Sequence, residues 1–155
     1  MEQYRLNVIP DTDPQPPTDY GDDKAAFVHG RHRDFHVGPE MDKAEGMHQY
    51  PLYAYIHSGV HLSLGDPQDM WDSGQVGYVC ITKDESDIPK PEEYAQGMVK
   101  EWNQYLSGDC WGFEIEHVET GDIVDSCWGF FGEDYCREEG TQMLECFNVQ
   151  LQLAI

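Results

Sequence analysis

The chain has 155 residues, with 9 Lys plus Arg against 30 Asp plus Glu, so its formal net charge is −21. This excess of acid argues against direct binding to nucleic acid, which requires clustered Lys and Arg, and against docking on anionic membranes. The hydrophobic fraction of 39% and the aromatic fraction of 12% are too high for a disordered acidic chain. We therefore expect one folded domain spanning residues 1–155.

The chain shows no sign of export or membrane insertion. No apolar run approaches the roughly 18 residues of a membrane span, and no basic and then apolar signal peptide opens the sequence. The cysteines are odd in number and include no C-x-x-C pair, which fits neither a disulfide framework nor a structural zinc site. We expect a cytoplasmic protein with reduced thiols that pack as small hydrophobic side chains, namely Cys80, Cys110, Cys127, Cys136 and Cys146.

The first quarter of the chain predicts two short strands separated by loops. Tyr4–Ile9 alternates weakly between apolar and polar residues, as an opening strand does. Four prolines and five aspartates in residues 10–23 exclude a helix or a central strand and predict a surface loop. Ala25–Arg33 predicts a second strand, and the polar stretch Gly38–His48 predicts another loop.

Residues 50–64 predict a hairpin. Alternating apolar residues lie on both sides of Ser58-Gly59, which indicates a strand, a tight turn and a second strand. Residues 65–74 are polar, contain Asp-Pro and predict a second surface loop. The β-branched residues of Gly77–Thr82 are typical of a central strand.

A helix is predicted from Pro91 to about Leu106. Pro91 suits the first helical turn, and Glu92 and Glu93 suit the positive end of the helix dipole. Gly108 is placed to terminate the helix. The apolar residues that follow at helical spacing are Tyr94, Met98, Val99, Trp102, Tyr105 and Leu106.

An internal repeat predicts a second hairpin. Cys-Trp-Gly-Phe occurs at residues 110–113 and again at residues 127–130, with a turn signal around Thr120-Gly121 between them. Closing the hairpin there pairs Trp111 with Phe130 and Phe113 with Trp128 on one buried face. The opposite face then carries Glu114, Glu116 and Asp125.

The last segment predicts a second amphipathic helix over Glu133–Val149, with Tyr135, Cys136, Met143, Leu144 and Phe147 on its apolar side. Runs of hairpin-compatible strands with two late helices indicate an α+β fold. We expect a mostly antiparallel sheet, containing the Cys-Trp-Gly-Phe hairpin, packed by two amphipathic helices on one face.

Three histidines are the candidate metal ligands. His29, His32 and His36 lie close together in sequence, and imidazoles can bind divalent metals. Arg31 and Arg33 lie between them and oppose a bound cation, and a strand would direct His29 and His32 to opposite faces. We therefore expect no metal and no other cofactor. Cys110 is a conceivable nucleophile beside one of the histidines, although no spacing supports that pairing.

The strongest signal is the concentration of acid in the last third of the chain. Residues 101–145 hold twelve acidic residues and one basic residue, a net charge of −11. Self-repulsion of this size costs stability and exceeds what solubility requires. Carboxylates spaced like DNA phosphates would compete for the basic groove of a DNA-binding protein. The candidate partner-binding residues are Asp109, Glu114, Glu116, Glu119, Asp122, Asp125, Glu133, Asp134, Glu138 and Glu139.

Four motifs stand out in the chain: Tyr50-Pro51-Leu52-Tyr53, Trp71-Asp72-Ser73-Gly74-Gln75-Val76-Gly77, Gly108-Asp109-Cys110-Trp111-Gly112-Phe113 and Asp125-Ser126-Cys127-Trp128-Gly129-Phe130. With these motifs the chain resembles a family of small acidic proteins common in phages, prophages and plasmids. The resemblance covers most of residues 10–140, while the acidic last third and the apolar C-terminus depart from the pattern. The family has no settled activity, so the resemblance implies a mobile-element origin and no catalytic residues.

Charge and resemblance together predict a non-enzymatic accessory protein that mimics DNA. Its partner would be a host DNA-binding protein or nucleoprotein defence complex, as in restriction or CRISPR interference. One alternative is a small enzyme that depends on a metal at His29, His32 and His36 or on the thiol of Cys110. Another is a structural or regulatory phage protein whose acidity is incidental. The oligomeric state and the identity of the target stay open.

Overall fold

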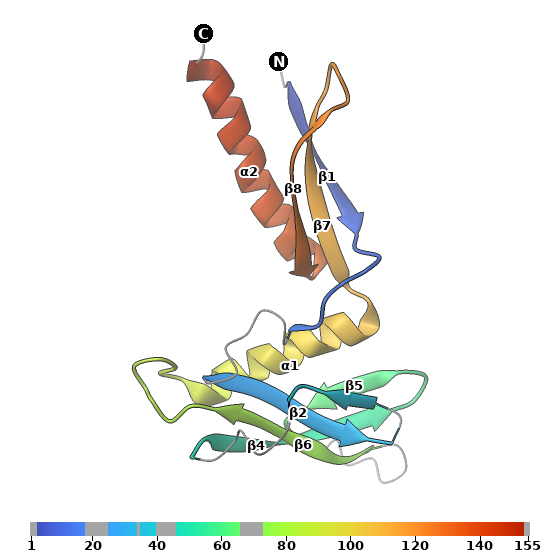
Figure 1. Cartoon of the computed structure of the whole chain (residues 1–155), viewed down its shortest axis with the longest axis vertical. Helices are drawn as coiled ribbons and strands as arrows, with labels where there is room; N and C mark the ends of the chain where they lie inside the picture. The colour runs from blue at the N-terminus through green and yellow to red at the C-terminus, as the bar shows by residue number, and fades with distance from the viewer. Residues whose placement is uncertain (1–2, 18–24, 34, 40–45, 66–72, 154–155) are drawn as a thin grey trace. The chain divides into compact units, whose positions relative to one another are not determined.

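A computed structural model describes residues 3–17, 25–33, 35–39, 46–65 and 73–153 (Figure 1). Contacts divide the chain into two compact units. Residues 16–107 form one, which we call the central unit. Residues 1–15 join residues 108–155 to form the other, which we call the terminal unit. Each unit has its own hydrophobic core, and the expectation that both fold as one domain stays a prediction.

The central unit is a five-stranded antiparallel sheet with one helix packed against it (Figure 1). The strand order is β3-β2-β6-β4-β5, so strands far apart in sequence are neighbours. Its elements are β2 (Ala26–His32), β3 (Phe35–Val37), β4 (His48–Ile56), β5 (Val60–Ser63), β6 (Ser73–Ile81) and α1 (Pro91–Ser107).

Helix α1 begins at the residue that the sequence predicts and ends within one residue of its predicted end. Pro91 is its first residue, and Gly108 follows its last residue in a left-handed conformation, with φ of +79°. Ala95, Val99 and Trp102 are buried against the sheet, as spacing of three and four residues dictates. Tyr94, which the sequence places on the apolar side, is exposed instead.

The three predicted loops are shorter than expected. Ser73 and Gly74 already belong to β6, His48 belongs to β4, and Pro10 belongs to the first strand of the terminal unit. Residues 18–23, 40–45 and 66–72 of these loops lie outside the described residues. Strand β3, which falls between two predicted elements, was not predicted, because its three residues are too few to show alternation.

The terminal unit is a three-stranded antiparallel sheet with a long helix along it (Figure 1). The strand order is β1-β7-β8, so the first strand pairs with a strand more than one hundred residues later. Its elements are β1 (Tyr4–Pro10), β7 (Cys110–His117), β8 (Ile123–Phe131) and α2 (Glu133–Leu153).

The core of the terminal unit lies between α2 and one face of this sheet. Phe113, Ile115 and Cys136 are buried there. A close approach of helix and sheet is possible because Gly140 has no side chain: a Cβ at this position would lie 2.6 Å from Leu6 Cδ1. The half-buried residues that complete this core are Tyr4, Leu6, Val8, Trp111, Phe130, Met143, Leu144 and Phe147. Tyr135, predicted among them, is exposed.

The predicted hairpin register is half right. Trp111 pairs with Phe130 as expected, but Trp128 pairs with Gly112 instead of Phe113. A bulge causes the slip, because Gly129 adopts φ of +88° and adds one residue to β8. Directly paired residues share a face. Trp111 therefore faces α2, while Trp128 lies on the opposite face and is exposed.

The α+β class is confirmed, with strands in antiparallel pairs throughout the described chain. The single sheet with two helices is wrong in one respect. Two sheets form, and each carries one helix, because β1 pairs with β7 and not with a strand of the central unit.

Candidate functional site

The terminal unit concentrates negative charge with little compensation. Its residues include 14 Asp or Glu and only two basic residues, Arg5 and Arg137, a net charge of −12. Both arginines already pair with acids. Arg5 contacts Glu116, and Arg137 Nη2 lies 3.2 Å from Glu133 Oε1. The other described carboxylates of this unit have no ion-pair partner among the described residues.

Glu116 is a candidate acid that links two neighbouring strands of the sheet. It lies opposite Arg5 in the β1–β7 register and accepts hydrogen bonds from Arg5 and from Asn7 Nδ2, the latter at 3.0 Å. These bonds lower the pKa of Glu116 to about 2, and the bond from Arg5 has the larger effect. Its charge therefore joins β1 to β7 and is less available to a partner than the other candidate carboxylates.

We expect this ion pair to make stability depend on pH. The pKa of Glu116 is near 2 in the folded state and near 4.5 without its partners. Its contribution is therefore complete above about pH 4.5 and is lost as the pH falls towards 2. Glu116→Gln should remove part of the acid-induced decrease in unfolding free energy, measured by denaturant titration between pH 6 and pH 3. Glu119→Gln, which removes a carboxylate of the exposed turn and keeps the contact between Arg5 and Glu116, is the matched control for the lost charge, and equal profiles for wild type and Glu116→Gln would contradict the assignment.

Two further predicted residues have structural contacts. Asp109 accepts a hydrogen bond from Trp111 Nε1 at 2.6 Å, and its carbonyl accepts one from the amide of Gly132 at 2.9 Å. Asp109 therefore joins the start of β7 to the end of β8, at the open end of the hairpin. Glu114 is half-buried on the face away from α2, where it lies opposite Ser126.

The other candidate acids are mostly exposed. Glu119 and Asp122 lie in the β7–β8 turn and Asp125 lies on β8. On α2, Asp134 and Glu138 are four residues apart on one face, where like charges are destabilising, and Glu139 is half-buried. The candidate acids whose residues are exposed are Glu119, Asp122, Asp125, Glu133, Asp134 and Glu138.

The predicted grouping of Glu114, Glu116 and Asp125 on one face is wrong. Asp125 pairs with Ile115, a core residue that faces α2. The bulge at Gly129 shifts residues 125–128 by one relative to the predicted pairing and so moves Asp125 to the helix side. Asp125 is exposed there because the helix covers β8 incompletely.

The three histidines of residues 29–36 lie on two strands. His29 is buried, and its Nδ1 lies 2.6 Å from the Pro39 carbonyl. His32 stacks on Phe35, with ring centroids 5.2 Å apart, and His36 is exposed. No group of three or more metal-ligating side chains occurs among residues that the structure describes.

We expect purified protein to contain no zinc at these histidines. Their neighbouring arginines oppose a cation, and His29 is occupied by a backbone contact. Metal analysis after dialysis against micromolar zinc should give less than stoichiometric zinc, both for wild type and for His32→Ala. Stoichiometric zinc that is lost in His32→Ala would contradict this.

The geometry disfavours Cys110 as a nucleophile. Cys110 is buried, and its pKa is raised by burial and by the nearby charges of Asp11 and Asp109. A reactive thiol needs a lowered pKa and access to substrate. Burial raises the pKa of Cys80 and Cys136 to about 11 as well. These buried cysteines therefore act as small core residues, as expected, whereas Cys127 and Cys146, expected to pack in the same way, are exposed.

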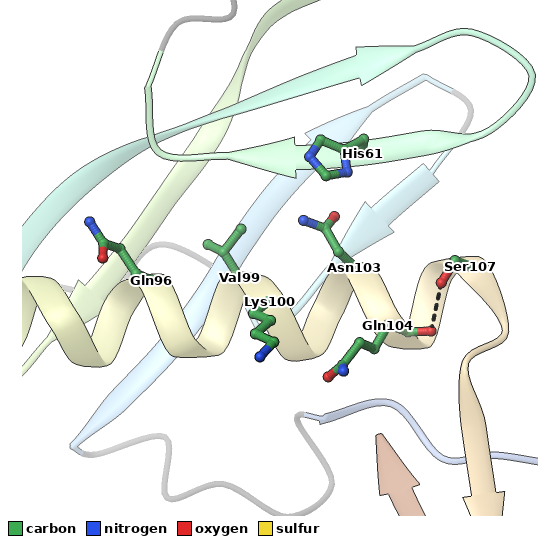
Figure 2. A pocket seen from close by; sticks show the side chains of 7 residues that line it. All are labelled: His61, Gln96, Val99, Lys100, Asn103, Gln104 and Ser107. Carbon is green, nitrogen blue, oxygen red and sulfur yellow. Dashed lines mark hydrogen bonds between the residues drawn. The ribbon is translucent and has the colours of Figure 1, made fainter. Parts of the chain in front are cut away.

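The central unit has an open groove of about 430 Å³ between β5 and α1. Figure 2 shows His61 on β5 and the side chains of α1 that line it. Asn103 is used structurally: it donates to the Leu62 carbonyl at 2.8 Å and accepts from the Leu62 amide at 2.7 Å. This side-chain amide pairs with both backbone groups of Leu62 on the edge strand β5, and the described residues that line the groove include no carboxylate. The residues that line it are His61, Gln96, Val99, Lys100, Asn103, Gln104 and Ser107.

Sequence reasoning missed the exposed tryptophan. Trp128 lies across Gly112, where a Cβ would come within 2.0 Å of Trp128 Cε3. Its exposed fraction is 45%. The glycines of the two Cys-Trp-Gly-Phe repeats are the sequence signal that indicates this position. Gly129 permits the bulge, and Gly112 has no side chain, so the indole of Trp128 can lie over its backbone.

No protein family, curated protein or solved structure matches this chain. No helix in the described ranges is long and apolar enough to cross a membrane.

Proposed function

We propose that this chain is a non-enzymatic, mobile-element-encoded inhibitor that acts by DNA mimicry in the cytoplasm of a bacterial host. Its terminal unit presents carboxylates to the basic surface of a nucleic-acid-directed defence protein, such as one of restriction or CRISPR interference. The observation that supports this most is the charge of −12 on that unit, whose two arginines are both paired with acids.

The placement of the exposed acids supports the same proposal. They lie on two regular elements, the β7–β8 hairpin and α2, so secondary structure sets the spacing of their backbone positions. Asp134, Glu138 and Glu145 follow one side of α2 at intervals of roughly 6 and 10 Å along the axis. Charges at such spacing attract a basic surface over distances comparable to the Debye length, about 8 Å at physiological salt.

The alternative of a metal- or thiol-dependent enzyme has weaker support. Cys110 is buried with a raised pKa, and the histidines are separated by strand geometry. A structural or regulatory phage role would not require uncompensated charge, which costs stability through repulsion. Charge therefore favours binding to a basic partner over either alternative.

Expression in a panel of bacterial strains tests the proposal. Each strain carries one defined restriction or CRISPR system, and each is challenged with a phage that the system restricts. We expect expression to raise the plating efficiency by at least tenfold with one or more systems. A panel in which no system is relieved, with the protein expressed in soluble form, would contradict the proposal.

A further inference from the structure

The outer strand of the terminal unit has a free edge. β8 pairs with β7 on one side, and no strand in the described part of the chain pairs with its other side. Every residue from Ile123 to Trp128 is exposed. A long edge strand with exposed apolar residues is a template for pairing with another chain.

Backbone contacts show which amides of β8 lie on that edge. The carbonyl of Cys110 accepts from the amide of Asp11, so even-numbered residues of β7 direct their backbone groups to β1. Gly112 and Glu114 share this parity, and their partners on β8 are Trp128 and Ser126.

It follows that Trp128 and Ser126 direct their backbone groups away from β7, to the free edge. The amide of Ser126 donates to the carboxylate of Asp125 at 2.8 Å. The Asp125 carboxylate therefore occupies the place that a carbonyl of an added strand would take.

Trp128 is held beside this edge as a flat apolar anchor. Its ring lies against the backbone of Gly112, and 45% of the residue is exposed. An exposed aromatic side chain that becomes buried when a partner binds contributes strongly to the stability of the interface. The indole also attracts Lys or Arg through cation–π contact, and Glu114 lies on the same face of the sheet.

The negative charge of the terminal unit indicates which kind of chain can pair with the free edge of β8. A second copy would bring together two units of −12 each, which repel. A basic segment is attracted by Asp125 and by the turn acids Glu119 and Asp122 at one end of β8. When a partner carbonyl takes the Ser126 amide, the Asp125 carboxylate becomes available to a cationic side chain.

We propose that β8 binds an extended, Lys- and Arg-rich segment of a partner protein as an added strand, with Trp128 as its apolar anchor. This rests on the proposed function, because it names the form of the basic partner. Main-chain hydrogen bonds supply affinity, and alternate side chains of the segment contact Trp128 and the acids.

Two synthetic peptides serve as probes. One is a ten-residue peptide that alternates Lys or Arg with Val, and the other has the same sequence with every backbone amide N-methylated. An N-methylated amide, like that of proline, cannot donate to a strand ladder. We expect wild-type protein to bind the first at least tenfold more tightly than the second, measured by calorimetry at physiological salt.

Ser126→Pro tests the free edge with little cost to the fold. Proline is tolerated where a strand amide faces solvent, and the Ser126 amide makes no bond to β7 in this register. We expect Ser126→Pro to bind both peptides equally weakly, while the control Ser126→Ala, which keeps the amide, binds like wild type. Circular dichroism checks that both variants are folded.

The outcomes separate this inference from the proposed function. Equal binding of the two peptides by wild type, or unchanged binding by folded Ser126→Pro, would overturn strand addition. So would a dimer of the wild type that Ser126→Pro dissociates, because the occupant would then be a second copy. Relief of restriction that persists in Ser126→Pro leaves the proposed function standing and overturns the added strand as its means. A peptide preference without relief in any strain contradicts the proposed function alone.

Discussion

Reversing three exposed acids of the terminal unit should abolish relief of restriction. Glu119, Asp122 and Glu138 are exposed and have no ion-pair partner among the described residues. Each pair with a partner cation contributes about 0.5 kcal/mol, and each Lys adds repulsion of similar size, about 3 kcal/mol for the three sites together. The triple change to Lys should therefore weaken binding by roughly 100-fold, at about 1.4 kcal/mol per tenfold. Plating efficiency of the restricted phage is the measurement.

A matched control separates local from total charge. Glu85, Asp87 and Glu92 of the central unit are also exposed, and changing them to Lys alters net charge equally. We expect this variant to retain relief. Loss of relief in both triple variants would show that total charge, and not the terminal unit, is responsible. Relief in both variants would show that these carboxylates do not contribute to binding.

Gly77→Ala should strongly destabilise the central unit. A Cβ at Gly77 would lie 1.9 Å from the carbonyl oxygen of His29, in the backbone of the neighbouring strand β2. Strand backbones cannot separate locally without losing hydrogen bonds, so we expect a loss of about 3 kcal/mol in unfolding free energy. Chemical denaturation followed by circular dichroism measures it.

Gly97→Ala is the control. Gly97 lies exposed in α1, a Cβ added there would have no atom within 4 Å, and alanine suits a helix better by about 1 kcal/mol. The control should therefore be as stable as wild type or more so. A Gly77→Ala protein of wild-type stability would contradict the close strand pairing of β2 and β6.

Local signals predicted the elements well. Pro91, the following glutamates and Gly108 placed α1 within one residue of its observed ends. The turn at Ser58-Gly59 predicted the β4–β5 hairpin, where Ser58 has φ of +59°. Such signals act between residues close in sequence, so the sequence shows them directly.

The pairing of strands that are distant in the chain could not be predicted from the sequence. Arg5 and Glu116 are opposite each other because β1 crosses to β7, and no local pattern indicates this partner. Gly129 signals that a bulge is possible but does not fix it, since a glycine permits positive φ without requiring it. That one bulge decides which face carries Trp128 and separates Asp125 from Glu114.

Competition with DNA tests the central claim most directly. The defence protein relieved in the plating assay is purified and bound to a fluorescent DNA duplex, and this protein is titrated in while anisotropy is recorded. We predict full displacement of the duplex by wild type, with an apparent affinity that falls steeply as salt rises, and no displacement by the Glu119, Asp122 and Glu138 triple variant. A complex in which the defence protein holds duplex and inhibitor together would contradict DNA mimicry.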